Sequence, residues 1–71
     1  MRRKSDEDIA KAYLTALDFK HPDTILPMFI GTVQMARRAN PAINSLQEFR
    51  QWIRELPFEV EPDPELEELL A

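Results

Sequence analysis

Apolar residues recur at helical spacing through most of the chain and are densest between residues 24 and 39. When each residue turns by about 100°, the apolar positions of this stretch cover an arc of roughly 220° around a helix axis. The polar remainder is a narrow wedge. Because a helix with a single partner cannot cover so wide an apolar face, we expect this helix to be central. The apolar face of this helix is then buried by neighbouring segments of the same chain or by a second chain.

Prolines and capping residues predict where the helices begin and end. Pro22 separates the first helix from the central one, and Thr24 is the expected N-cap of the central helix. This choice puts Pro27 at the third helical position, where no amide donor is required. Ser45, followed by Glu48 three residues later, forms a capping box for the third helix. These signals predict helices at 6–18, 25–39 and 46–56.

The two flanking helices leave part of the central helix uncovered. Each has one narrow apolar stripe, and the two stripes together cover about 160° of the apolar arc. We expect the remaining edge to bind a partner protein or to form a dimer interface. Its residues are Ile25, Met28, Met35 and Ala39.

An acidic extension at 58–71 follows the predicted helical domain at 1–57. It consists of an extended segment and a short predicted helix at 64–70, whose leucines share one face. Two interpretations stay open: the leucines enter an apolar groove of a partner, or they complete the small core of this chain. These leucines are Leu66, Leu69 and Leu70.

The elements together predict an all-α fold, a small three-helix domain around a central helix. The extended acidic segment and the short C-terminal helix complete it. A domain of 71 residues buries only about 60% of the surface of its unfolded chain, so its stability is marginal. Small helical domains often gain stability by association, and we expect a homodimer as one possible state.

The net charge of −4 is unevenly distributed. Residues 1–58 carry nine Lys and Arg against seven Asp and Glu, whereas residues 59–71 carry six acids and no base. The body is therefore mildly basic and the tail strongly acidic. Overall acidity alone consequently does not exclude a nucleic-acid partner.

The sequence contains no cysteine, which excludes disulfides and thiolate metal sites and fits a reducing compartment. Acidic residues at 6–8 follow the basic start, where a signal peptide needs apolar residues. No apolar run is long enough to span a membrane. We therefore expect a cytoplasmic protein without a membrane partner.

Residues suited to catalysis are scarce. Both serines lie where N-caps are expected, and the single glycine excludes a glycine-rich phosphate loop. The one histidine, His21, lies in a turn beside a proline and apart from any cluster of metal ligands. We expect no enzymatic activity, no metal and no cofactor. The residues left over for a catalytic site are Asp6, Asp8 and His21.

The second and third predicted helices, joined by a short turn, could also form a helix-turn-helix. The outward face of the third helix carries amide and guanidinium groups suited to base edges and phosphates, and the central helix ends in two arginines. The same pattern is the solvated face of any amphipathic helix, and the turn contains no glycine. The candidate nucleic-acid-binding residues are Arg37, Arg38, Gln47, Arg50, Gln51 and Arg54.

A family resemblance is confined to the first 39 residues. It is carried by Ala12-Tyr13-Leu14, Ala16-Leu17, Pro22, Leu26, Gly31, Val33, Ala36, Arg37 and Arg38. With gaps, these positions resemble the opening helices of the bacterial addiction-module antidote proteins, small DNA-binding antitoxins. The resemblance implies a helical protein that contacts a toxin and can bind its own operator. That family continues into a helix-turn-helix with a glycine-containing turn, whereas this chain continues through Pro41 to an acidic tail. No functional residue is therefore carried over.

The wide apolar face and the missing catalytic set favour a non-catalytic, regulatory or protein-interaction role. In this hypothesis the chain binds another protein, or a second copy of itself, through the central helix and the tail. The alternative is a DNA-binding regulator that uses the Gln and Arg side chains of the third helix.

Overall fold

The computed structural model describes residues 3–70, without the side chains of Leu66 and Leu70. Between residues 3 and 70 the regular structure is entirely helical, so the predicted all-α fold class is confirmed. The elements are α1 (Asp6–Ala16), the 3₁₀ turn η1 (Pro22–Thr24), α2 (Leu26–Ala39), α3 (Leu46–Arg54) and α4 (Leu66–Leu70).

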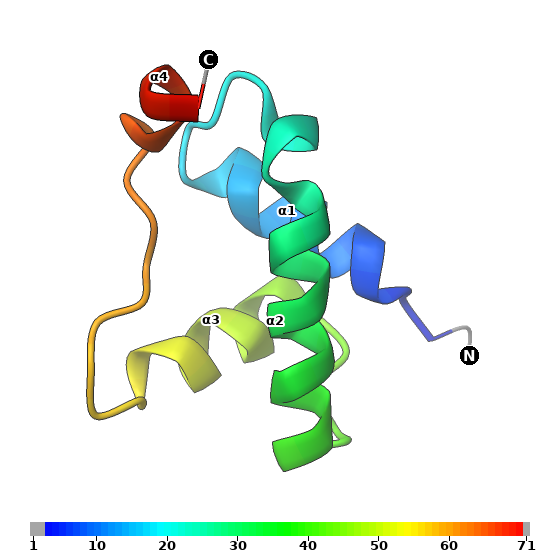
Figure 1. The fold of residues 1–71 in the computed structure, drawn as a ribbon. Helices are drawn as coiled ribbons and strands as arrows, with labels where there is room; N and C mark the ends of the chain where they lie inside the picture. Colours follow the sequence, from blue (N-terminus) through cyan, green and yellow to red (C-terminus); the bar gives the residue numbers. More distant parts are fainter. Residues whose placement is uncertain (1–2, 71) are drawn as a thin grey trace.

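The helix α2 is the central element of the arrangement. In Figure 1, α1 and α3 both pass behind α2, and no other helix covers the side of α2 that faces the viewer. The chain then leaves α3 as an extended segment, which runs along the outside of the molecule and returns to α4 beside the turn that follows α1. One side of α2 is therefore packed and the other is open.

An aromatic contact joins the three main helices at the centre of the core. The Tyr13 ring of α1 lies 5.7 Å from the Phe29 ring of α2 and 5.0 Å, edge to face, from the Phe49 ring of α3. Such pairs add to the free energy gained by burying the rings. The core residues are Ile9, Ala10, Tyr13, Leu14, Phe19, Ile25, Leu26, Phe29, Val33, Ala36, Ile43, Phe49 and Ile53.

The start of α2 differs from the prediction, which made Thr24 its N-cap. Thr24 instead ends η1, and Ile25 is the residue before the helix, with helical backbone angles and no side-chain cap. The Ile25 amide donates to the Pro22 carbonyl at 3.1 Å, so the 3₁₀ turn leads directly into α2 and supplies a backbone partner. Pro27 lies in the first turn, where its missing amide leaves no donor unsatisfied.

The other helix ends lie within two residues of the predicted ones. The helix α1 ends at Ala16, because Asp18 adopts a left-handed conformation with φ 67° and reverses the chain. Ser45 caps α3 as expected: its hydroxyl oxygen accepts the Glu48 amide at 3.2 Å. The Glu48 carboxylate returns to the Asn44 amide, also at 3.2 Å.

Candidate functional site

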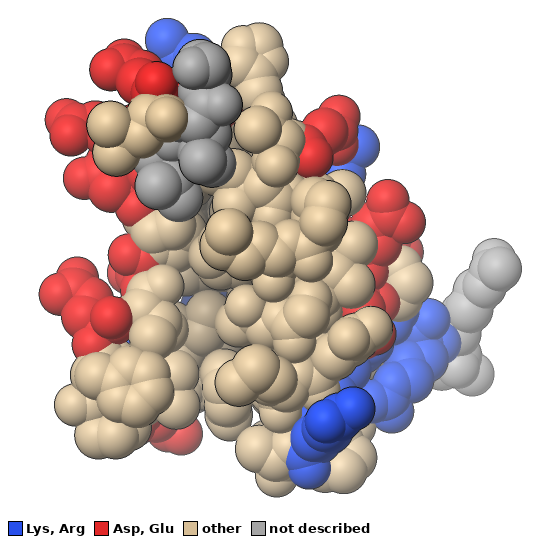
Figure 2. Space-filling model, in the orientation of Figure 1, with Lys and Arg blue, Asp and Glu red and all other residues tan. Residues whose placement is uncertain are grey.

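The open side of α2 exposes two large apolar side chains. Met28 is 63% exposed and Met35 is 62% exposed, and they lie seven residues apart on one face of the helix. Figure 2 shows this side of the molecule, where uncharged residues form a broad area over α2 and charged residues gather at its margins. Exposed apolar side chains grouped in this way are typical of interaction sites.

These methionines form one wall of a cavity of about 390 Å³, which we call the apolar groove. The opposite wall comes from the end of α3 and from the extended segment that follows it. Every residue that lines the groove is uncharged. The lining residues are Met28, Phe29, Thr32, Met35, Trp52, Leu56, Phe58 and Val60.

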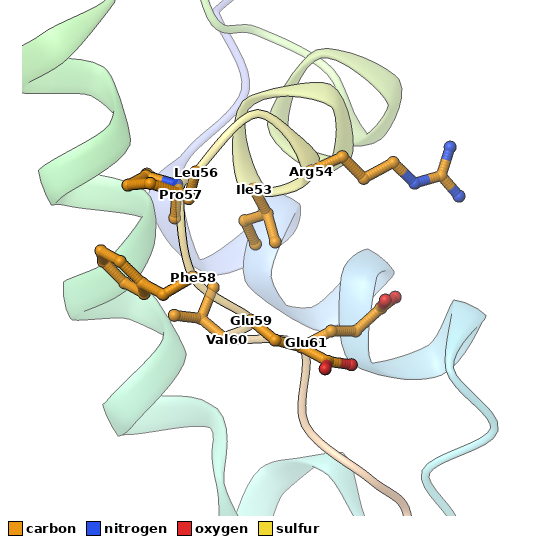
Figure 3. Close-up of a pocket in the computed structure, with 8 residues that line it drawn as sticks. All are labelled: Ile53, Arg54, Leu56, Pro57, Phe58, Glu59, Val60 and Glu61. Carbon is orange, nitrogen blue, oxygen red and sulfur yellow. The ribbon is translucent and has the colours of Figure 1, made fainter.

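A second hollow, of about 380 Å³, adjoins the groove and shares Leu56, Phe58 and Val60 with it (Figure 3). Phe58 points toward α2, whereas the carboxylates of Glu59 and Glu61 point to the opposite side, as Arg54 of α3 does. The alternation of apolar and acidic residues in the segment therefore gives it one apolar and one charged side. The remaining lining residues are Ile53, Arg54, Pro57, Glu59 and Glu61.

A third hollow, of about 390 Å³, meets the groove at Trp52. Five of its six lining residues have polar side chains, and the charged ones are the carboxylates Glu48 and Glu55. Across the three connected hollows, the charged lining residues are Glu48, Glu55, Glu59, Glu61 and Arg54. Four acids and one base give the side of the groove formed by α3 and the extended segment a negative charge, whereas Lys and Arg gather at the lower right edge of the uncharged area in Figure 2.

The structure separates the four residues that were expected on the uncovered edge of the central helix. Met28, Met35 and Ala39 are exposed, whereas Ile25 is 1% exposed and belongs to the core. The expected place of Ile25 on this edge is wrong. Ile25 lies one helical turn before the buried Phe29, and its carbonyl accepts the Phe29 amide at 3.3 Å, so its side chain shares the packed side of the helix.

The tail is attached to the body by a carboxylate. Glu67 of α4 accepts hydrogen bonds from the backbone amides of Lys20 and His21, at 2.7 and 2.6 Å. Leu69 is 80% exposed and does not enter the core. The side chains of Leu66 and Leu70 lie outside the described part of the structure. Two charge-assisted hydrogen bonds therefore hold α4 next to the turn after α1.

The side chain of Arg37, one of the candidate nucleic-acid contacts, is hydrogen-bonded to other parts of the chain. Its guanidinium donates to the Asp6 carboxylate at 2.6 Å, to the Lys4 carbonyl at 2.8 Å and to the Ile43 carbonyl at 3.0 Å. A longer bond, of 3.3 Å, reaches the Asn44 side chain. These interactions use four of the five N–H donors of Arg37, so little of the guanidinium is left for a phosphate.

The other candidate nucleic-acid-binding residues differ in their exposure and in their hydrogen bonds. Arg38, Gln47 and Arg54 are exposed. Gln51 donates its side-chain amide to Glu55 at 2.9 Å, and the buried Nε of Arg50 has no hydrogen-bond partner among the described residues. The face of α3 that was expected to read nucleic acid is thus only partly available to a ligand.

Tyr13 is the buried titratable residue at the centre of the core. Burial raises the pKa of its phenol to about 12, with a further rise from the charge of Glu61 and a partly opposing effect from Arg50 and Arg54. The hydroxyl finds no hydrogen-bond partner within residues 3–70. A phenol with this pKa stays protonated at neutral pH, so Tyr13 is a structural residue rather than an acid–base group.

The structure also shows the contacts of the candidate catalytic residues, and its described residues can be searched for metal ligands and for membrane-spanning helices. Of the leftover catalytic candidates, Asp6 forms an ion pair with Arg37, and His21 contributes its backbone amide to the contact with α4. In residues 3–70 no group of three or more His, Cys, Asp or Glu is placed to hold a metal ion. Within the same residues, no helix has the length and apolar character required to cross a membrane.

Comparisons of the chain with family models, with curated proteins and with solved structures find no match. Residues Trp52, Leu56, Phe58 and Val60 were not predicted as part of a site. The sequence did place the first two on the apolar stripe of the third helix. The alternation after Pro57 was the one signal for the other two, and it does not say which surface they meet.

Proposed function

We propose that this chain is a non-catalytic helical protein that binds another protein through the apolar groove. The observation that carries this proposal is the exposure of Met28, Met35 and Phe58 around an uncharged cavity of about 390 Å³. Exposed apolar side chains grouped around a cavity gain free energy when a partner removes them from water. Isolated apolar residues at scattered surface positions would not suggest a binding site.

The residues of the groove suit a partner surface that is not flat. Methionine is unbranched and flexible, so Met28 and Met35 can adapt to a partner side chain. Trp52 and Phe58 offer large apolar contact areas, and aromatic residues are enriched where binding free energy is concentrated.

A regulatory protein of the cytoplasm is the biological role that we propose for this interaction. The resemblance of the first 39 residues to addiction-module antidote proteins supports such a role, because those proteins act by contacting a toxin. The absence of cysteine fits a reducing compartment. In this proposal the acidic tail assists binding through its charge, while the groove supplies the apolar contact.

The test is affinity capture from native lysate, with nuclease treatment, by the full chain and by two variants. The groove variant is Met28→Ser/Met35→Ser, and the control is Gln34→Ser, an exposed position on the same helix. Circular dichroism first establishes that all three proteins are equally helical. We expect a protein partner that survives nuclease, is retained by the control and is lost with the groove variant.

Two results would contradict the proposal. Retention of every captured protein by the groove variant would show that the groove is not the binding site. Capture that disappears on nuclease treatment would favour the alternative, a DNA-binding regulator that uses Gln47, Arg50, Gln51 and Arg54. For that regulator, affinity for duplex DNA should fall steeply with salt.

A further inference from the structure

We propose that the occupant of the apolar groove is an amphipathic helix of a partner protein, with apolar anchor residues flanked by Lys or Arg. This inference rests on the proposed function, since it names the partner of the same groove. It follows from two independent properties of the surface: the linear arrangement of the groove wall on α2, and the sign of the charge at the margins.

The wall of the groove on α2 is about two helical turns long. Met28, Thr32 and Met35 follow one another at spacings of four and three residues, so they line one face of α2. With a rise of about 1.5 Å per residue, Met28 and Met35 are about 10 Å apart along the axis. A helix laid beside α2 presents anchors at positions i, i+3 or i+4, and i+7 over the same length.

The opposite wall offers receiving positions for such anchors. Trp52 lies near the end of α3 and Leu56 two residues after it, and Phe58 and Val60 continue the apolar wall along the extended segment. Phe58 is 61% exposed and Val60 is 36% exposed, so both retain apolar area that a partner would cover. The groove thus has a helical wall and an extended wall, an arrangement that suits a rod-shaped element.

The charges at the margins of the groove indicate which charge the polar side of the partner helix should carry. The carboxylates Glu48, Glu55, Glu59 and Glu61 line the two hollows that adjoin the groove, and Arg54 is the one base that lines them. Charge complementarity across an interface favours the opposite sign on the partner and raises the association rate. The flanks of the partner helix should therefore carry Lys or Arg.

The same charges disfavour a second copy of this chain as the occupant. In a two-fold symmetric dimer each surface patch faces the same patch of the other subunit. The acidic margins of one copy would then meet the groove region of the other, which carries the same acidic margins, and like charges brought together cost free energy. A dimer through the groove is accordingly the competing outcome of the test.

The single tryptophan of the chain makes the test direct, because Trp52 lines the groove and reports binding by its fluorescence. The probes are three tryptophan-free helical peptides of about 15 residues with identical leucine anchors at i, i+4 and i+7. Their flanking positions are all Lys, all Gln or all Glu. We expect the Lys peptide to bind about tenfold more tightly than the Glu peptide at low salt, with the Gln peptide between them.

Salt and charge variants identify the origin of this preference. The Lys-to-Glu affinity ratio should approach one at an ionic strength of about 1 M, where the Debye length is about 3 Å. Glu59→Gln/Glu61→Gln should reduce the ratio several-fold at low salt and leave the affinity for the Gln peptide unchanged. The control Glu7→Gln/Glu68→Gln removes the same charge from exposed positions outside the three hollows and should preserve the ratio.

The outcomes separate this inference from the proposed function. Equal affinity for the three peptides, lost in Met28→Ser/Met35→Ser, would overturn the basic partner and leave the groove as a protein-binding site. Failure of every peptide to bind, by fluorescence and by calorimetry, would overturn the inference, whereas the proposed function is decided by the capture experiment. Sedimentation that shows a dimer whose dissociation exposes Trp52 would assign the groove to a second copy and overturn the inference.

Discussion

Replacing Arg37 by Ala should destabilise the fold strongly, although Arg37 is one of two neighbouring arginines at the end of α2. Its side chain is 12% exposed and joins α2 to the start of α1 through Asp6 and to the loop before α3 through the Ile43 carbonyl. These segments are separated by 31 and 6 residues in the sequence. The guanidinium therefore links the end of α2 to the start of α1 and to the loop before α3.

The expected loss can be worked out from the four acceptors of Arg37. Hydrogen bonds that involve a charged group contribute about 1.5–3 kcal/mol each, but the contributions of one side chain are not additive. The bond to Asn44 is long, at 3.3 Å, and the bond to Lys4 is exposed. We therefore count mainly the bonds to Asp6 and Ile43 and expect a loss of about 3 kcal/mol.

A loss of this size should be easy to measure in so small a domain. Stabilities of about 0.05–0.15 kcal/mol per residue give this chain about 4–11 kcal/mol in total. The midpoint of thermal unfolding should fall by about 12–24 °C in Arg37→Ala. Urea and thermal unfolding followed by far-ultraviolet circular dichroism measure both quantities.

The matched control is Arg38→Ala, because Arg38 is the next residue in the helix and is exposed. We expect its free energy of unfolding to change by no more than about 0.5 kcal/mol. A double-mutant cycle with Asp6→Ala should show coupling between Asp6 and Arg37. Equal unfolding midpoints for Arg37→Ala and Arg38→Ala would refute the structural role assigned to Arg37.

Three further changes have defined outcomes. Gly31→Ala should raise the free energy of unfolding by about 0.5–1 kcal/mol in urea titrations, since Gly31 lies inside α2 with open space where a Cβ would be; a decrease would contradict this. The Tyr13 pKa of about 12 exceeds its ordinary value of 10.0, so the unfolded chain loses this proton first and stability should fall as the pH rises from 10 to 12. In Tyr13→Phe the free energy of unfolding should fall less over this pH range and should change little near neutral pH, because the hydroxyl makes no hydrogen bond within residues 3–70. An equal fall in both proteins would contradict the raised pKa of Tyr13. Glu67→Ala should accelerate hydrogen exchange at the Lys20 amide about tenfold, while Glu68→Ala should not.

Much of the secondary structure is readable from short-range signals in the sequence. Ser45 and Glu48 lie three residues apart and form their cap whatever the rest of the chain does. Phe19 departs from the apolar stripe of the first helix, and in the structure it packs into the core from the turn after α1. Helix ends are harder to predict because the last turn of a helix depends on the conformation of the residues after it, as the left-handed Asp18 shows.

The start of α2 shows where local reasoning fails. Thr24 is a suitable N-cap by residue type, but η1 satisfies the beginning of α2 with backbone groups, and no side-chain cap forms. Ile25 is expected on the open edge, but it lies one helical turn before the buried Phe29 and shares the packed side of α2 with it. In the structure this side chain turns into the core.

The sequence by itself determined that the fold is helical and that its central helix carries more apolar surface than two narrow stripes can cover. It also located Met28 and Met35 on that helix, since angular position along a helix is a local property. Only the tertiary structure decided that Phe58 and Val60 lie opposite them, that Glu67 attaches α4 to the body and that Arg37 is an internal contact. Each of these pairings joins residues more than twenty positions apart, and their distance depends on how the helices pack rather than on any spacing along the chain.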